Sequence, residues 1–256
     1  MNRFDLTGKK GLIVGIANQQ SIAYGCAKAL KEQGADLAIT YLNEKAKPYV
    51  EPLANEVEAE LFLACDVTQQ EQVDSMFDEI EKQWGQIDFL IHSIAFAPLE
   101  DLHCRLIDTS KEGFLMAMDI SCHSLMRLAK KSEALMENGG SIFAMSYLGA
   151  NKAINNYNLM GPVKAALESS VRYLAYELGG KGIRVHAISP GPISTRAASG
   201  LAGFDEFLKH AEQRSPLPKK LDIDDVGSLV SFLASDAAAS ITGDTIYIDS
   251  GYHVMG

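Results

Sequence analysis

Tyr157 and Lys164, a phenol and an amine, stand seven residues apart in the stretch "YNLMGPVK". Along an α-helix this spacing is about two turns, or roughly 10 Å, and returns the side chain to nearly the same face. One bound cofactor could therefore span both groups. The phenol could donate a hydrogen bond to a substrate oxygen, while the ammonium could hold ribose hydroxyls. The regular helix is predicted either to start near Pro162 or to be locally distorted there, which leaves Tyr157 on its entry turn.

The elements that must position this pair alternate between short apolar runs and longer segments with helical periodicity. Runs that are apolar almost throughout are typical of strands buried on both faces of a parallel sheet. The sequence therefore predicts a single α/β domain over residues 1–256 with a Rossmann fold, a doubly wound seven-stranded parallel sheet with helices on both faces. The predicted strands are 10–15, 36–41, 61–66, 88–93, 141–146, 183–189 and 245–249. The predicted helices are 21–33, 44–57, 69–84, 109–137, 157–179, 200–213 and 223–235.

Ligands of open α/β sheets bind at the carboxyl ends of the strands, so the residues that follow each strand are the candidates. After the first strand, Gly15 permits a tight turn, and Ser21 can cap a helix whose N-terminus could hold a diphosphate. A plain strand-turn-helix would explain the same glycine. Asp66, after the third strand, could accept a hydrogen bond from an adenine amino group or cap the next helix. Ser93, after the fourth, leaves room for a flat ring or a ribose.

The composition excludes several other classes of protein. The chain has 256 residues, of which 47% are hydrophobic and 22% charged, as in an ordinary globular protein. A formal net charge of -10 argues against nucleic-acid binding. Neither a signal peptide nor a run of eighteen apolar residues is present, so no membrane association is expected. The four cysteines and six histidines show no metal-binding spacing, which indicates no metal site and a reducing, cytoplasmic location.

Several motifs occur along the chain in a fixed order: "SIAYG", "CDV", "HSIAFAP", "DIS", "SYLGA", "YNLMGPVKAALESSVRYLAYELG" and "GPISTRAASG". From about residue 5 to the C-terminus they resemble the enoyl-acyl carrier protein reductases, a divergent branch of the short-chain dehydrogenase/reductase family. The Tyr-x6-Lys spacing separates this branch from the ordinary Tyr-x3-Lys members. The resemblance implies reduction of the trans-2 double bond of an enoyl thioester on acyl carrier protein, in fatty acid biosynthesis, by a homotetramer.

The resemblance also implies roles for individual residues. Hydride would reach the β-carbon of the enoyl group; Tyr157 would stabilise the resulting enolate, Lys164 would bind the nicotinamide ribose, and Tyr147 is the second active-site tyrosine. The remaining predicted dinucleotide contacts are Gly15, Ser21, Ile22, Leu42, Asp66, Val67, Ser93, Ile94, Ile193, Ser194, Thr195, Arg196 and Ala197, and the predicted substrate contacts are Ala97, Met160, Leu201 and Phe204.

The choice between NADH and NADPH depends on the residues after the second strand. The side chain of Leu42 can bind neither ribose hydroxyls nor a 2′-phosphate, and Glu44 would repel the phosphate. No Arg or Lys follows immediately, so the sequence favours NADH over NADPH.

Residues 194–214 are predicted to form a substrate lid, because an amphipathic segment lies there between glycines, with Leu201 and Phe204 available to line an acyl pocket. A plain surface helix is the alternative. The same segment carries Asp205 and Glu206, where basic residues would suit an acidic carrier protein.

The carrier of the acyl group is therefore left open. Either docking uses Arg196, Lys209 and Arg214, or the substrate is carried on coenzyme A. Two alternative functions also remain: a short-chain dehydrogenase/reductase that acts on a carbonyl or an alcohol, and a non-catalytic dinucleotide-binding protein.

Overall fold

Seven parallel strands form one sheet in the order β3-β2-β1-β4-β5-β6-β7. The computed structural model describes residues 2–196, 198–200 and 203–255. The strands are β1 (Lys10–Val14), β2 (Asp36–Tyr41), β3 (Leu61–Ala64), β4 (Phe89–His92), β5 (Gly140–Met145), β6 (Ile183–Pro190) and β7 (Thr245–Ile248). All seven predicted strands are confirmed, and no end differs by more than two residues. The strand order reverses between β1 and β4, which is where such sheets bind ligands.

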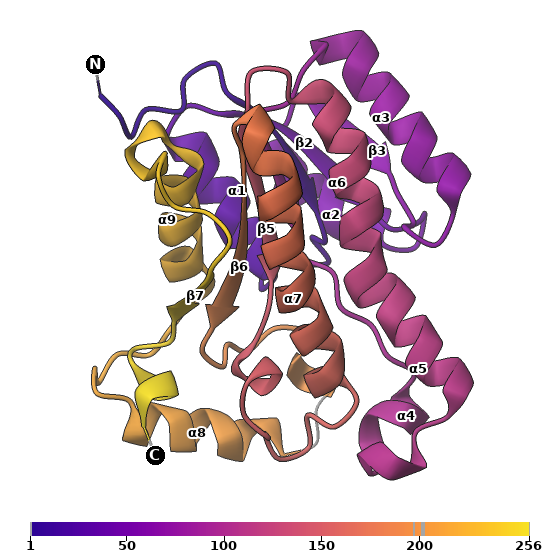
Figure 1. Ribbon diagram of the computed structural model, residues 1–256, viewed down its shortest axis with the longest axis vertical. Helices are drawn as coiled ribbons and strands as arrows, with labels where there is room; N and C mark the ends of the chain where they lie inside the picture. The colour runs from indigo at the N-terminus through magenta and orange to yellow at the C-terminus, as the bar shows by residue number, and fades with distance from the viewer. Residues whose placement is uncertain (1, 197, 201–202, 256) are drawn as a thin grey trace.

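Helices cover both faces of the sheet, and each face has its own apolar core (Figure 1). One face packs against α1 (Ile22–Glu32), α2 (Lys47–Glu56) and α9 (Ile223–Ala234), and the other against α3 (Gln70–Trp84), α6 (Ser124–Leu135) and α7 (Met160–Leu178). The predicted doubly wound Rossmann fold is thus confirmed. No helix in the described part of the chain is long and apolar enough to cross a membrane.

The predicted helix 109–137 is wrong as a single element. It consists of α5 (Lys111–Met118), a π-helical turn over Asp119–His123, and α6. The hydroxyl of Ser121 donates to the Phe96 carbonyl at 3.0 Å and accepts from the Phe96 amide at 2.8 Å. These bonds tie the wide turn to the loop after β4, 25 residues away in sequence, and such a contact leaves no trace in hydrophobic periodicity. The five-residue α4 (Leu99–His103), in the same loop, was not predicted.

Helix α7 begins at Met160, between residue 157, where the helical segment was predicted to start, and Pro162, near which its regular part was predicted to start. Asn156 (φ 61°) and Asn158 (φ 38°) adopt left-handed backbone conformations, which a right-handed helix cannot include. Pro162 lies in the first turn of α7, where its missing N–H removes no helical hydrogen bond. The prediction that Tyr157 precedes the regular helix is therefore confirmed.

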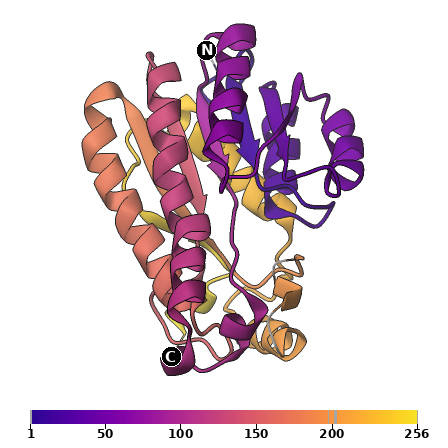
Figure 2. The same ribbon diagram turned by 90° about the vertical axis from the view of Figure 1, so that its right-hand side faces the viewer.

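Helix α8 (Phe204–Arg214) lies across the carboxyl ends of the strands, next to the C-terminal segment (Figures 1 and 2). It starts at Phe204 rather than at residue 200, because Gly203 stands at the N-cap with φ 71°. The rings of Phe207 and Tyr252 meet edge to face, with centroids 6.1 Å apart. The C-terminal turn therefore packs directly on α8.

Candidate active site

Tyr157 lies in the turn before α7, between the two left-handed asparagines. Its ring packs on Tyr147 with centroids 4.8 Å apart. The other neighbour is Gly149, where a Cβ would lie only 2.2 Å from the Tyr157 ring, so any larger residue there would displace the phenol. The turn, Tyr147 and Gly149 together fix a ring that is 8% exposed.

Burial raises the pKa of Tyr157, and the charge of Glu168 raises it further. Burial also raises the pKa of Tyr147, with smaller contributions from the neighbouring tyrosines Tyr157 and Tyr252. Both phenols keep their protons at neutral pH. They are therefore suited to donate hydrogen bonds to an oxygen that gains negative charge, and not to act as bases.

Lys164 lies in α7 and is 4% exposed. Its Nζ donates to the carbonyl of Met145, the last residue of β5, at 2.6 Å. Burial lowers the pKa of Lys164 to about 8, although Cys122 and Glu168 act in the opposite direction. An ammonium has three N–H donors, so the Met145 bond leaves two that could bind hydroxyls of a ligand.

His92 at the end of β4 is a packed histidine, as its surroundings show. It is fully buried, and its Nε2 lies 2.7 Å from the hydroxyl of Ser124. That hydroxyl donates to the Ile120 carbonyl at 2.6 Å, so we assign the imidazole proton to Nε2. Burial, with the nearby charge of Lys164, lowers the pKa of His92 to about 3, and the ring is neutral.

The loop between β1 and α1 packs closely against the residue that follows β4, where the strand order reverses. Gly15 has φ 116°, and a Cβ there would lie 2.0 Å from the Ser93 carbonyl. Ser21 is the N-cap of α1, but the prediction that its side chain caps the helix is wrong. Its hydroxyl instead accepts from the amides of Ala17 (3.0 Å) and Asn18 (3.1 Å), which fixes the loop and leaves the first amides of α1 without a side-chain cap.

The other predicted nucleotide contacts lie at strand ends on the same edge. Asp66 is half-buried, and one of its carboxylate oxygens accepts from the amide (2.9 Å) and the hydroxyl (2.7 Å) of Thr68. This local bond is compatible with either interpretation of Asp66. Val67 is buried, Leu42 is exposed, and Ser93, Ile94 and Ile22 are half-buried.

The segment after β6 contributes residues of mixed exposure. Ile193 is buried, Ser194 and Arg196 are exposed, and Thr195 accepts from the Ala198 amide through its hydroxyl at 3.1 Å. The predicted contacts Ala197 and Leu201 lie outside the described residues, as does the side chain of Asp205.

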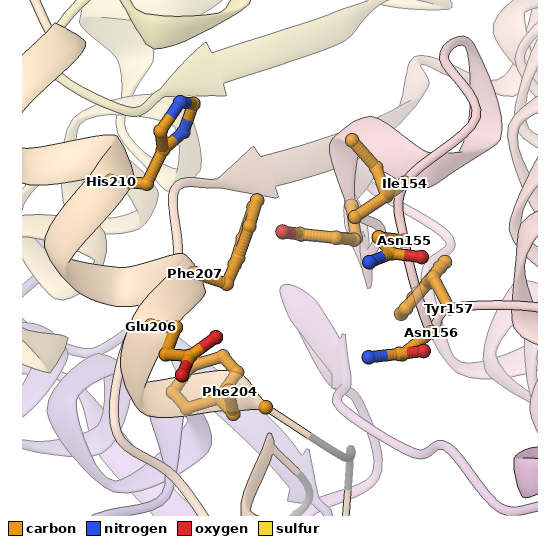
Figure 3. Close-up of a pocket in the computed structure, with 10 residues that line it drawn as sticks. Ile154, Asn155, Asn156, Tyr157, Phe204, Glu206, Phe207 and His210 are labelled. Carbon is orange, nitrogen blue, oxygen red and sulfur yellow. The ribbon is translucent and has the colours of Figure 1, made fainter.

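A cavity of about 340 Å³ opens between the two tyrosines and α8. Figure 3 shows Phe204, Phe207 and His210 of α8 on one side and Ile154, Asn155, Asn156 and Tyr157 on the other. The remaining lining residues are Tyr147, Gly203 and Glu206. The volume is within the range of small-molecule sites. Of the predicted substrate contacts, Phe204 lines this cavity. Met160 is instead buried in the apolar core, and half-buried Ala97 packs against that core.

Two sets of residues at this site were not predicted. Phe207 and His210 line the cavity and lie three and six residues after Phe204, a helical spacing that could have identified them. Glu168 lies one turn after Lys164 on the buried face of α7 and is 4% exposed. Its position four residues after Lys164, which places both side chains on one face of the helix, could have identified it.

A dinucleotide fits the donors that this edge of the sheet presents. The first turn of α1 has no side-chain cap and can face an anion, and Lys164 lies in a buried site with two N–H donors that Met145 does not use. A family model described as enoyl-(acyl carrier protein) reductase matches residues 15–253. The chain belongs to this family of reductases.

Relatives within the reductase family match nearly the whole chain. The enoyl-acyl carrier protein reductase (NADH) FabI of a Nostoc species is 48% identical over 255 residues, which cover 98% of this chain and 99% of the relative. A crystal structure of the Anaplasma phagocytophilum reductase in complex with NAD superposes with a TM-score of 0.95 at 47% identity, covering 98% and 96% of the two chains. The Bacillus cereus reductase with NADP⁺ and indole naphthyridinone gives a TM-score of 0.96 at 44% identity, covering 98% of both chains.

Proposed function

We propose that this protein is an NADH-dependent enoyl-acyl carrier protein reductase that reduces the trans-2 double bond of enoyl thioesters in fatty acid biosynthesis. The observation that carries the proposal is the buried Tyr157, paired with Tyr147 at the wall of the cavity and followed on α7 by the buried Lys164. The membership of the reductase family and the NADH dependence in the names of its relatives support it.

The nucleotide would lie along the carboxyl edge of the sheet. Gly15, Ser21 and Ile22 would hold the diphosphate at the start of α1, Asp66 and Val67 the adenine, and Ser93 and Ile94 the centre of the cofactor. Ile193, Ser194, Thr195, Arg196 and Ala197 would cover it, and Lys164 would bind the nicotinamide ribose through the two N–H groups that Met145 does not use. The cofactor supplies the hydride when bound.

Tyr157 would act on the thioester oxygen of the substrate. As hydride adds to the β-carbon, the electron pair of the double bond moves toward this oxygen, which becomes an enolate. A protonated phenol at that oxygen stabilises the enolate by hydrogen bonding, and the raised pKa keeps the proton on Tyr157. A proton then adds to the α-carbon and completes the reduction. Tyr147 would hold the Tyr157 ring in place through their contact.

Residues 194–214 would form the substrate lid, with the acyl chain in the cavity beneath α8. Phe204 and Phe207 would provide the apolar wall and Leu201 would extend it, while Met160 and Ala97 would border the site from the core side. The volume of this cavity and its aromatic lining suit a small apolar acyl group.

NADH is the proposed cofactor, and NADPH is less favoured. Leu42 after β2 is exposed and offers no charge to a 2′-phosphate, and exposed Glu44 would repel one. The relatives from Anaplasma phagocytophilum and Bacillus cereus were crystallised with NAD and NADP⁺ respectively, so both cofactors belong in the assay.

We also propose a homotetramer in the cytoplasm. Several large apolar side chains on α5, α6 and α7 are exposed in the single chain, namely Leu115, Met116, Met126, Tyr173 and Tyr176. Exposed apolar surface of this kind is typical of an interface between subunits. The four cysteines are free, which suits a reducing compartment.

The assay that tests the function follows the absorbance of NADH, and in parallel that of NADPH, with crotonyl thioesters of acyl carrier protein and of coenzyme A, side by side. We expect turnover, and we expect Lys164→Ala to lose most of it because the ribose is no longer held. Preference for the coenzyme A ester would mean that the acidic Glu206 at the cavity mouth disfavours the acidic carrier protein. Reduction of ketones with no loss of crotonyl thioester would replace the proposal with carbonyl chemistry.

A further inference from the structure

Glu168 is a buried acid that the reaction described above does not use. It lies in α7 one turn after Lys164 and is 4% exposed. One carboxylate oxygen accepts a hydrogen bond from the Ser146 hydroxyl at 2.6 Å, and the other accepts from the Asn151 side-chain amide at 2.9 Å. A carboxylate in the protein interior is costly unless its oxygens are paired, and these two hydrogen bonds offset part of that cost.

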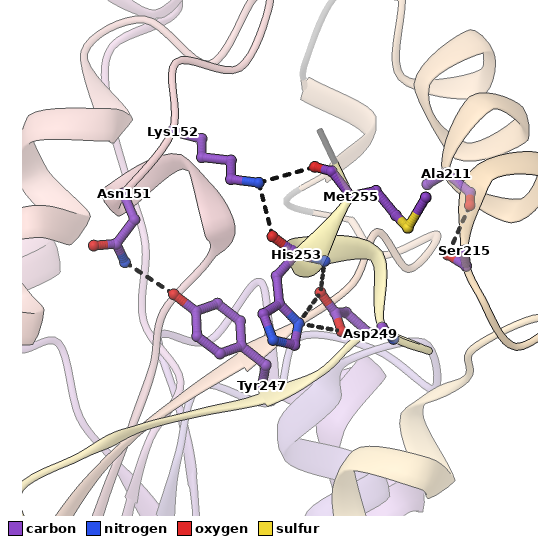
Figure 4. A network of polar contacts seen from close by, with 9 residues as sticks. Asn151, Lys152, Ala211, Ser215, Tyr247, Asp249, His253 and Met255 are labelled. Atoms are coloured by element: carbon purple, nitrogen blue, oxygen red, sulfur yellow. Dashed lines mark hydrogen bonds and ion pairs between the residues drawn. The ribbon is translucent and has the colours of Figure 1, made fainter.

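The two donors stand on either side of Tyr147. Ser146 directly precedes this tyrosine and is tied to β6 by its amide, which donates to the Ile188 carbonyl at 2.7 Å. Asn151 follows the short helical turn after Tyr147, and its amide also contacts the Tyr247 hydroxyl at 3.1 Å, as Figure 4 shows. The carboxylate of Glu168 therefore fastens both ends of the loop 146–151, which carries Tyr147 and Gly149 against the ring of Tyr157.

We propose that Glu168 is a positioning residue for this reaction: its carboxylate holds the loop 146–151 in place and supplies the negative charge that keeps Lys164 protonated. The inference rests on the proposed function for its consequence in turnover, but its effect on Lys164 is a property of NADH binding alone.

The groups that face Lys164 differ in charge. From β5 comes the Met145 carbonyl, from β4 His92, from the π-helical turn Cys122, and from α7 Glu168 itself. Burial lowers the pKa of His92 to about 3 and raises the pKa of Cys122, so both are neutral near pH 7. Among these described groups, Glu168 is the one that carries a negative charge to offset the burial of the ammonium.

The direction of the effect follows from the sign of the charge. Burial lowers the pKa of Lys164 to about 8, while Cys122 and Glu168 raise it. Removal of the Glu168 charge lowers it further, so the ammonium loses its proton at a lower pH. An uncharged amine binds ribose hydroxyls less well. The alkaline limit of NADH binding should therefore move toward neutral pH in a variant without this charge.

Glu168→Gln removes the charge but keeps the shape. Asn151 can turn its amide over, so that its oxygen accepts from Gln and from Tyr247, and the network persists. We expect the alkaline limit of NADH binding, measured by fluorescence titration, to fall by about one pH unit, with several-fold weaker binding near pH 8. Near pH 6.5 the variant should bind NADH about as tightly as the unmodified protein.

Two further variants separate charge from folding. Glu177→Gln removes an exposed acid from the same helix and should leave the pH dependence unchanged. Ser146→Ala removes one hydrogen bond to Glu168 and no charge; it should lower kcat several-fold with the pH limit of binding in place. It also provides a test if Glu168→Gln does not fold.

The outcomes also distinguish this inference from the proposed function. An unshifted pH limit in Glu168→Gln, or an unchanged kcat in Ser146→Ala, would overturn the corresponding half of the inference. If the unmodified protein binds NADH but reduces no enoyl thioester, the proposed function fails, while a shifted limit in Glu168→Gln would still support the charge effect on Lys164.

Discussion

Burial acts in opposite directions on the two residues that carry the chemistry. It raises the pKa of the Tyr157 phenol and lowers the pKa of the Lys164 ammonium to about 8. At neutral pH the phenol is therefore a hydrogen-bond donor, and the amine still carries the charge with which it can hold ribose hydroxyls. Burial thus keeps Tyr157 in the protonated state that its proposed role requires, whereas for Lys164 it opposes the required charge, which Glu168 helps to maintain.

Tyr157→Phe tests the role of the phenol. The substitution keeps the ring and its contact with Tyr147 but removes the donor to the thioester oxygen. We expect kcat with an enoyl thioester to fall by about 10- to 100-fold, with NADH affinity within about twofold of the unmodified protein. Tyr49→Phe, at an exposed position of α2, is the matched control. Equal loss in both variants, or none in Tyr157→Phe, would remove the phenol from the mechanism.

At the scale of the elements, the turn before α7 determines where Tyr157 lies. Asn158 has φ 38° and its side-chain amide donates to the Leu102 carbonyl of α4 at 3.0 Å. An asparagine tolerates the left-handed conformation better than most residues and adds a tether that glycine cannot supply. The position of the tyrosine thus depends on a loop that is distant in sequence.

Substitutions at Asn158 separate the backbone from the tether. Asn158→Gly keeps access to the left-handed conformation and loses the bond to Leu102, whereas Asn158→Ala loses both. We therefore expect kcat to fall less in Asn158→Gly than in Asn158→Ala. The alanine variant should also lose about 1 kcal/mol more stability than the glycine variant in thermal or denaturant unfolding. An alanine variant as stable and active as the glycine variant would show that this backbone strain is unimportant.

The same elements show how far the sequence could predict the structure. The seven strands were found because each is an apolar run bounded by turn residues, and the predicted edge of the sheet is the one across which α8 and its cavity lie. The π-helical turn was missed because the bonds of Ser121 to Phe96 link segments 25 residues apart. The paired oxygens of Glu168 were missed for the same reason, since Ser146 and Asn151 come from another element. The local pattern of apolar residues predicts which segments are buried, but it cannot identify the hydrogen-bond partners of polar side chains.

At the scale of the whole molecule, the C-terminal segment connects the site to the rest of the chain. Tyr252 packs on Phe207 of α8, and His253 stacks on Tyr247 with centroids 4.1 Å apart. The ammonium of Lys152 donates to the carbonyls of His253 (2.7 Å) and Met255 (3.1 Å), as Figure 4 shows. The wall of the cavity is thus held by residues from the end of the sequence.

The proposed assembly gives a prediction at this scale. Leu115→Glu places a charge on the exposed apolar face of α5, where 55% of the leucine is accessible in the single chain. We expect the unmodified protein to have the mass of a tetramer in size-exclusion chromatography with light scattering, and the variant to dissociate at least in part. An unmodified protein that elutes as a monomer at micromolar concentration would contradict the assembly.

The central claim is hydride transfer to the β-carbon of an enoyl thioester, and isotope labelling tests it most directly. The protein is incubated with crotonyl thioester and NADH that carries deuterium at the transferable position, and the product is analysed by mass spectrometry and NMR. The account predicts a saturated thioester with deuterium at the β-carbon, and a much lower yield with Tyr157→Phe. Deuterium on a carbinol carbon, or an unchanged crotonyl thioester in the presence of bound NADH, would contradict it.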